Sequence, residues 1–165
     1  MRIAVGSDHG GYQLKLLVAD HLAAAGHVVD DLGTDAADVP VDYPDYGAAV
    51  GRAVTSGSAE VGVCVCGTGI GIAIAANKIP GVRAAVVHDV TTARLARQHN
   101  HANVVCLGGR LLGSQVALDA VDAFLAATFD GGRHQRRIDE ITALEQATAG
   151  LSAAAASSHP TKERR

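Results

Sequence analysis

A valine-rich run that passes directly into three alternating glycines constrains this chain more than any other stretch. Residues 61–66 read Val-Gly-Val-Cys-Val-Cys, and glycines follow at alternate positions, Gly67, Gly69 and Gly71. This pattern is typical of a buried strand, a tight loop and the first turn of a helix. Glycines in such a loop can adopt positive φ and bring bare backbone amides close to an anion. The stretch therefore predicts an anion-binding loop with one thiol, Cys66, at its mouth.

Short apolar runs alternate with amphipathic segments along the first 130 residues. Strands are predicted at residues 2–6, 27–32, 61–66, 82–87 and 103–107. Helices are predicted at 14–25, 45–56, 88–98 and 114–127, and a further helix is predicted directly after the glycine loop. In the first of them, apolar residues fall at 14, 17, 18, 22 and 25. Strands that alternate with helices through short loops imply right-handed crossovers. We predict an α/β fold, a Rossmann-like three-layer αβα sandwich with a five-stranded, mostly parallel sheet.

Polar loops follow four of these strands, and three of these loops contain glycine. The four loops lie at residues 7–11, 66–71, 88–89 and 108–110. In open α/β sheets, ligands bind beyond the carboxyl ends of the strands. The agreement of topology and chemistry predicts a ligand site at this edge.

The C-terminal part of the chain follows a Gly131-Gly132 break. A helix is predicted at about 134–148, with Ile138, Ile141 and Leu144 on successive turns. A helix that is basic at one end and apolar along one stripe is suited to docking, and a second subunit is one such surface. We expect a single domain over residues 1–148 that includes this docking helix, and a disordered tail over 149–165.

The composition narrows the class of protein. Aromatic residues make up 3% of the chain and Trp is absent, which favours a core of Ala, Val, Leu and Ile. A formal net charge of −3 argues against a nucleic-acid binder. We also see no apolar run long enough for a membrane span and no leader, so we expect a cytoplasmic protein. The three cysteines have no zinc-site spacing, which predicts reduced thiols.

The glycine loop does not match the common nucleotide-binding motifs. A dinucleotide fingerprint requires a third glycine where Ile72 stands, and no Gly-Lys-Ser/Thr follows for a P-loop. The histidines lack the helical spacing of a metal site, so we predict no metal.

Several candidate site residues have a structural alternative. Cys66 stands at a strand end, where a thiol can act as a base or nucleophile, although most strand cysteines only pack. Asp8 is equally suited to capping the first helix. Tyr43 could pack or cover a ligand. The arginines at 133, 136 and 137 form either a solvated helix face or a phosphate site.

Several motifs together resemble one family of sugar-phosphate isomerases. The motifs are Gly6-Ser-Asp-His-Gly-Gly, Asp42-Tyr-Pro, Cys66-Gly-Thr-Gly-Ile-Gly, Ala75-Ala-Asn-Lys, Arg97-Gln-His-Asn, Gly109-Arg110 and Gly131-Gly-Arg-His-Gln-Arg-Arg-Ile. They occur in order over about residues 1–148. The chain thereby resembles the type B ribose-5-phosphate isomerases, which are grouped with the galactose-6-phosphate isomerase subunits.

The resemblance implies that aldose and ketose phosphates interconvert through an enediolate, without metal or other cofactor. Cys66 matches the proton-transferring base; some relatives use a glutamate at the place of Ile72. His99 matches the residue that helps open the sugar ring, with Asp8 nearby, and Thr68 helps to hold the enediolate oxygen. The implied substrate-binding positions are Asp8, His9, Tyr43, Gly67, Thr68, Gly69, Ile70, Gly71 and Asn100. The implied phosphate-binding positions are His9, Arg110, Arg133, His134 and Arg137.

The resemblance also implies partners and alternatives. It implies a homodimer whose protomers share the active site, with pairing into tetramers left open, and a small sugar phosphate as ligand. Ribose 5-phosphate is the expected substrate; allose, galactose or tetrose phosphates are alternatives. A non-catalytic sugar-phosphate-binding module is a further alternative. We expect no nucleic-acid or membrane partner.

Overall fold

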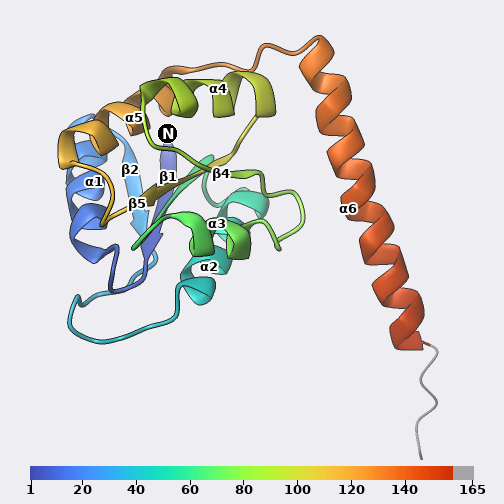
Figure 1. Cartoon of the computed structure of the whole chain (residues 1–165), viewed down its shortest axis with the longest axis horizontal. Coiled ribbons are helices and arrows are strands. Elements are labelled where there is room, and N and C mark those ends of the chain that lie inside the picture. Colours follow the sequence, from blue (N-terminus) through green and yellow to red (C-terminus); the bar gives the residue numbers. More distant parts are fainter. Residues whose placement is uncertain (158–165) are drawn as a thin grey trace, which may run out of the picture. The chain divides into compact units, whose positions relative to one another are not determined.

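The computed structural model describes residues 1–157, apart from the side chains of residue 149 and of residues 151–157. Its strands are β1 (Arg2–Ser7), β2 (Val28–Asp31), β3 (Val61–Cys66), β4 (Ala84–Val86) and β5 (Val104–Gly108) (Figure 1). Its helices are α1 (Tyr12–Ala24), α2 (Tyr43–Thr55), α3 (Ile70–Ala76), α4 (Val90–Asn100), α5 (Ser114–Ala126) and α6 (Arg133–Ser157). All strand pairs are parallel, in the order β2-β1-β3-β5-β4. The predicted five-stranded Rossmann-like fold is confirmed.

The two faces of the sheet carry separate hydrophobic cores. Along β3, Val63 and Val65 belong to the core formed with α1, α4 and α5, whereas Cys64 and Cys66 belong to the core formed with α2 and α3. This division follows from the two-residue period of a strand, since successive side chains point to opposite faces. Helices therefore cover both faces, which gives the three layers.

Small residues let the helices lie close to one another and to the sheet. A Cβ atom added to Gly47 of α2 would lie 2.7 Å from the Ile72 carbonyl oxygen of α3. The two backbones could not approach so closely with a larger residue there. This packing fixes α3 and hence the glycine loop that precedes it.

The chain leaves β1 and β3 in opposite directions. From β1 it passes through α1 to β2 at one edge of the sheet, and from β3 it passes through α3, on the other face, towards β4 and β5. Because β1 and β3 are hydrogen-bonded neighbours, their carboxyl ends form a topological switch point. Ligand sites of doubly wound α/β proteins lie at such points.

The stripe predicted for the first helix is partly wrong. Leu17 is 46% exposed, whereas Lys15 is fully buried with Leu14, Val18 and Leu22. Lys15 lies three residues before Val18 and so shares its face. An ion pair, described below, allows a charged residue to take the inward position.

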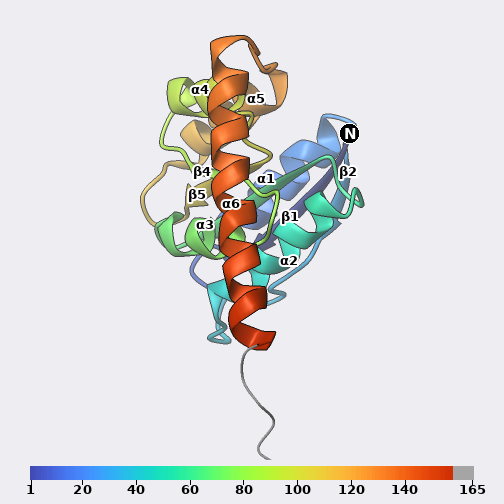
Figure 2. The same cartoon turned by 90° about the vertical axis from the view of Figure 1, so that its right-hand side faces the viewer.

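The chain from Gly131 onwards belongs to a second unit, separate from the unit formed by residues 1–130. Its helix α6 continues without interruption to Ser157, beyond the predicted end at 148 (Figure 2). Alanines at 153–156 have the highest helix propensity, which accounts for the extension. Docking of α6 to complete one domain over 1–148 stays a prediction, and residues 158–165 of the predicted tail lie outside the described part.

None of the helices in the described part of the chain is both long enough and apolar enough to cross a membrane.

Candidate active site

The loop after β3 folds its backbone amides around Cys66. Gly69 has a φ of 79°, a conformation that favours glycine, and it precedes the first turn of α3. Its amide donates a hydrogen bond to Cys66 Sγ at 3.1 Å. Thr68 Oγ1 accepts a hydrogen bond from the Ile70 amide at 3.3 Å. The thiol thus stands beside backbone donors, as the sequence predicted.

The loop after β5 is hydrogen-bonded to the loop that contains Cys66. The Gly109 amide donates to the Cys66 carbonyl at 2.8 Å, and the Arg110 amide donates to the Gly67 carbonyl at 3.0 Å. A Cβ atom on Gly108 would lie 2.9 Å from the Thr68 carbonyl oxygen, so only glycine permits this approach. The position of Arg110 is therefore tied to the position of the thiol loop.

The turn after β1 supplies the opposite side of the site. Asp8 Oδ1 accepts a hydrogen bond from the Gly11 amide at 2.9 Å and so holds the turn that leads into α1. His9 Nδ1 accepts from the Val41 amide at 3.2 Å. Asp8 does not cap α1, because the N-cap of this helix is Gly11 and no side chain caps it; Asp8 holds the preceding turn instead, and its side chain lines the pocket described next.

These loops enclose a pocket of about 540 Å³ at the carboxyl edge of the sheet. Its lining residues are Asp8, His9, Tyr43, Cys66, Gly67, Thr68, Ile70, Gly71, Ile74 and Arg110. All of them except Ile74 are predicted site residues. Ile74 follows Ile70 by one helical turn, so the period of the helix was a signal for it. Gly69 lies behind the lining, where its amide contacts Cys66.

Tyr43 forms one wall of this pocket. A Cβ atom on Gly71 would lie 2.7 Å from the Tyr43 ring, so the ring rests against the backbone of the glycine loop. The packing considered for Tyr43 is therefore observed and its ring also lines the cavity, whereas the covering of a ligand stays a prediction.

His99 and Asn100 lie at the other edge of the sheet. They end α4, which leads into β5 at the amino edge, where the Asn103 carbonyl accepts from the Gly62 amide at 2.9 Å. Gly62 and Cys66 are four residue steps apart along the extended strand, which is roughly 13 Å. His99 Nε2 lies 3.9 Å from Asp130 Oδ2. Within one chain, His99 is therefore far from Cys66 and from Asp8.

The predicted phosphate residues of the second unit lie in the first turns of α6. Arg133 and Arg137 are four residues apart and share one helix face. Arg133 Nε is 3.5 Å from His134 Nε2, whereas Arg136 pairs with Glu140 at 3.0 Å. Arg136 thus has an intrahelical partner, and the phosphate role of the other three residues stays a prediction.

The remaining cysteines pack in the core. Cys64 and Cys106 are fully buried partners in the β3–β5 register. A hydrogen bond with Cys64 and complete burial raise the pKa of Cys106 well above its usual value. All three cysteines are free thiols, as predicted, and only Cys66 reaches the pocket.

Comparison with known proteins identifies the family. A family model described as Ribose/Galactose Isomerase matches residues 3–141, and the chain belongs to this family. Ribose-5-phosphate isomerase B of Escherichia coli K12 is 46% identical over 145 residues, which cover 88% of this chain and 97% of that protein. The family predicted from the motifs is confirmed.

Solved structures of type B ribose-5-phosphate isomerases have the same fold. The Clostridium thermocellum enzyme superimposes with a TM-score of 0.88 at 50% identity, over 90% of this chain and 99% of that one. The Mycoplasma genitalium enzyme, solved with bound ribulose-5-phosphate, gives 0.85 at 45% identity over 88% and 96% of the two chains.

Proposed function

We propose that this protein interconverts ribose 5-phosphate and ribulose 5-phosphate through an enediolate. The observation that carries the proposal is the placement of the Cys66 thiol, the glycine-loop amides and Arg110 around one pocket, in a chain of this family. A base, oxyanion donors and a cationic group are what such an isomerisation requires.

Cys66 is the proposed base. It takes the proton from the carbon beside the carbonyl and returns it to the former carbonyl carbon, while the hydroxyl proton passes to the former carbonyl oxygen, so that no atom is gained or lost. The loop amides and Thr68 Oγ1 hold the oxygen that becomes negative. Fixed donors of this kind commonly contribute the largest share of catalysis. A positioned base adds about 10²–10⁴-fold.

His9 and Arg110 form the proposed phosphate end of the pocket, because both line it and an Arg fork matches phosphate oxygens. Arg133, His134 and Arg137 are also assigned to phosphate binding, because their motif resembles that of the family. A phosphate held far from the reacting carbons lets binding energy position them.

A second copy of the chain is proposed to complete the site. His99, the proposed ring-opening residue, and Asn100 lie at the amino edge of the sheet, away from the pocket of their own chain. A symmetric dimer can bring the amino edge of one protomer to the pocket of the other, since each contact then occurs twice. The free thiols fit a reducing compartment, which supports a cytoplasmic location.

Cys66→Ala tests the chemistry. We expect loss of about 10²–10⁴-fold in kcat, while ribose 5-phosphate still binds. Cys64→Ala, a truncation on the same strand face but outside the pocket, is the control and should keep its kcat. Solvent-tritium exchange into ribose 5-phosphate reports proton transfer directly. Full exchange by Cys66→Ala would refute the base assignment, and activity that depends on a divalent metal would refute the metal-free route.

Another sugar phosphate is the second candidate, because the family description includes galactose as well as ribose. A turnover assay on five-carbon and six-carbon phosphates, run side by side, decides between them. No proton exchange with any of them would identify a binding module instead.

A further inference from the structure

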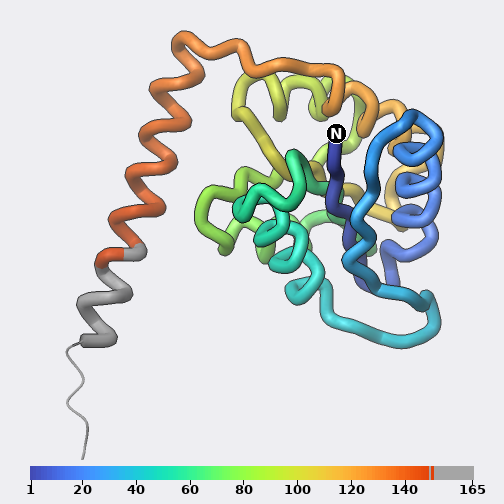
Figure 3. The backbone as a smooth tube through the Cα atoms, turned by 180° about the vertical axis from the view of Figure 1, so that it is seen from behind, coloured from blue at the N-terminus to red at the C-terminus, as the bar shows by residue number. Residues whose placement is uncertain are grey.

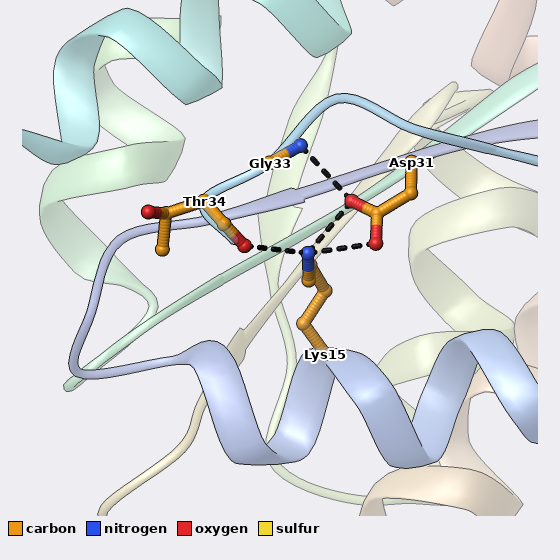
Figure 4. A network of polar contacts seen from close by, with 4 residues as sticks. All are labelled: Lys15, Asp31, Gly33 and Thr34. Carbon is orange, nitrogen blue, oxygen red and sulfur yellow. Dashed lines mark hydrogen bonds and ion pairs between the residues drawn. The ribbon is translucent and has the colours of Figure 1, made fainter. Parts of the chain in front are cut away.

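Lys15, in the first turn of α1, is buried completely. Its Nζ donates to both carboxylate oxygens of Asp31 at 2.7 Å and to the Thr34 carbonyl at 2.8 Å (Figure 4). Asp31 Oδ1 also accepts from the Gly33 amide at 2.9 Å. The ammonium group thus has three acceptors for its three protons.

Stability alone does not account for a lysine at this position. Taking an ammonium group out of water is costly, and replacing a buried ion pair by apolar residues is often neutral or stabilising. The buried neighbours of Lys15 on α1, Leu14 and Val18, are apolar. An apolar residue at position 15 would extend the apolar face that they form. What the ammonium provides, and an apolar side chain cannot, is a fixed position for the Thr34 carbonyl.

Thr34 lies near the start of the loop that joins β2 to α2. This loop forms a wide arc between the two elements (Figure 3). Its first end is held by Lys15 and by the Thr34 amide, which donates to the Ser7 carbonyl at 2.9 Å. Its second end is held by the Val41 amide, which donates to His9 Nδ1 at 3.2 Å. Residues 37–40 between these ends are exposed.

Both anchors of the loop therefore lie on the β1–α1 segment that carries Asp8 and His9. Directly after the second anchor the chain enters α2 at Tyr43, which is a wall of the pocket. The placement of Tyr43 relative to His9, the other residue on this side of the pocket, thus depends on a loop that is fixed at both ends. A binding wall that is fixed in advance lowers the ordering cost of binding.

We propose that Lys15 is a positioning residue for substrate binding: through Asp31 and the Thr34 carbonyl it fixes the loop over residues 33–42, and with it the His9–Tyr43 side of the pocket. Lys15 itself does not line the pocket. The kinetic consequence rests on the proposed isomerase function, whereas the anchoring of the loop does not.

Lys15→Met tests this inference, because it removes the ammonium group and keeps an unbranched side chain. Hydrogen exchange of the Thr34 and Val41 amides reports the two anchors without any substrate. We expect exchange at both amides to be at least about tenfold faster than in the wild type. The matched control is Val18→Ala, a buried truncation one turn further along α1, which destabilises the helix packing but keeps the anchor.

Kinetics on ribose 5-phosphate separate positioning from a purely structural role. We expect KM to rise about tenfold to 10²-fold in Lys15→Met while kcat stays within about threefold, because misplaced binding groups weaken binding before they alter the chemical step. Val18→Ala should leave KM and kcat unchanged, although its melting temperature should fall by an amount comparable to that of Lys15→Met. If Lys15→Met does not fold, Asp31→Asn provides a milder change and should shift both readouts in the same direction.

Three results would overturn the inference. Unchanged exchange at Thr34 and Val41 would mean that Lys15 does not fix the loop. Faster exchange with an unchanged KM, or a lower kcat at unchanged KM, would mean that the loop does not serve substrate binding. A wild-type protein that does not turn over ribose 5-phosphate would refute the proposed function instead, and the exchange measurements would then decide the anchoring on their own.

Discussion

Pairing two differently damaged chains tests whether the active site spans two protomers. The perturbations are Cys66→Ala in one chain and His99→Asn in the other, each carrying its own affinity tag. In one chain, Cys66 and His99 lie at opposite edges of the sheet, separated by roughly 13 Å of β3. Groups that act on one sugar must come within hydrogen-bond reach of it, about 3 Å. Each homodimer lacks one of these two residues at both of its sites and should therefore lose activity.

The heterodimer should recover about half of the wild-type activity. If sites are shared, one of its two sites combines the intact Cys66 of one chain with the intact His99 of the other, and the second site carries both defects. Tandem purification on the two tags isolates this species, and a ribulose 5-phosphate formation assay measures kcat per dimer. A wild-type chain paired with a Cys66→Ala chain is the positive control and should also give about half.

An inactive heterodimer beside an active positive control would refute the reasoning. In that case both residues would act within one chain, and the chain would have to rearrange to bring them together. The same measurement thus separates a shared site from a conformational change within a single protomer.

Two further predictions concern the glycine loop and the end of α4. Gly69→Ala should lower kcat about 10²-fold. Gly69 has a φ of 79°, and an added Cβ atom would lie 2.9 Å from the Leu107 carbonyl carbon, so the substitution would displace the amide that contacts Cys66. The control is Gly57→Ala, which has a φ of 80° but open space around it and should keep kcat in the same assay. Burial and the charges of Arg83 and Arg97 lower the pKa of His101, so folding stability should fall as pH drops below about 6.5, where the unfolded chain binds the proton first. His101→Asn should reduce this loss of stability, which melting curves between about pH 7.5 and pH 5 measure. An equal decrease of melting temperature with pH in the variant and the wild type would contradict the assignment.

The sheet and most of the pocket could be predicted from the sequence because both follow from local patterns. Alternating runs of strand and helix residues dictate parallel crossovers, and parallel strands place their following loops at one edge. The loops at 7–11, 66–71 and 108–110 then had to meet, and the pocket lining contains residues of all three.

The place of His99 was also implied by the order of elements, though less visibly. A residue at the end of a helix that leads into a parallel strand lies at the amino edge of the sheet, opposite to the loop of Cys66. The motif suggested one site for both residues, whereas the topology separates them within a chain. The predicted sharing of the site between two protomers agrees with this separation, and it stays a prediction.

The burial of Lys15 could not be predicted from its own segment. Period and polarity favour Leu17 for the inward position, and Leu17 is instead 46% exposed. The partner that decides the matter, Asp31, lies in another strand, and the third acceptor is a backbone carbonyl with no sequence signature. Tertiary ion pairing of this kind overrides local amphipathic patterns.

The exposed apolar residues at the pocket give a reason why a second copy would cover this edge. Ile70 and Ile74 are 52% and 58% exposed, although both line the cavity. Exposed apolar surface beside a polar site is typical of a surface that a partner covers. A protomer that delivers His99 there would also bury these isoleucines and exclude water. Because hydrogen bonds to a developing oxyanion are stronger where water is absent, the glycine-loop amides would then stabilise the enediolate most effectively in the dimer. Assembly and catalysis would thus depend on the same surface.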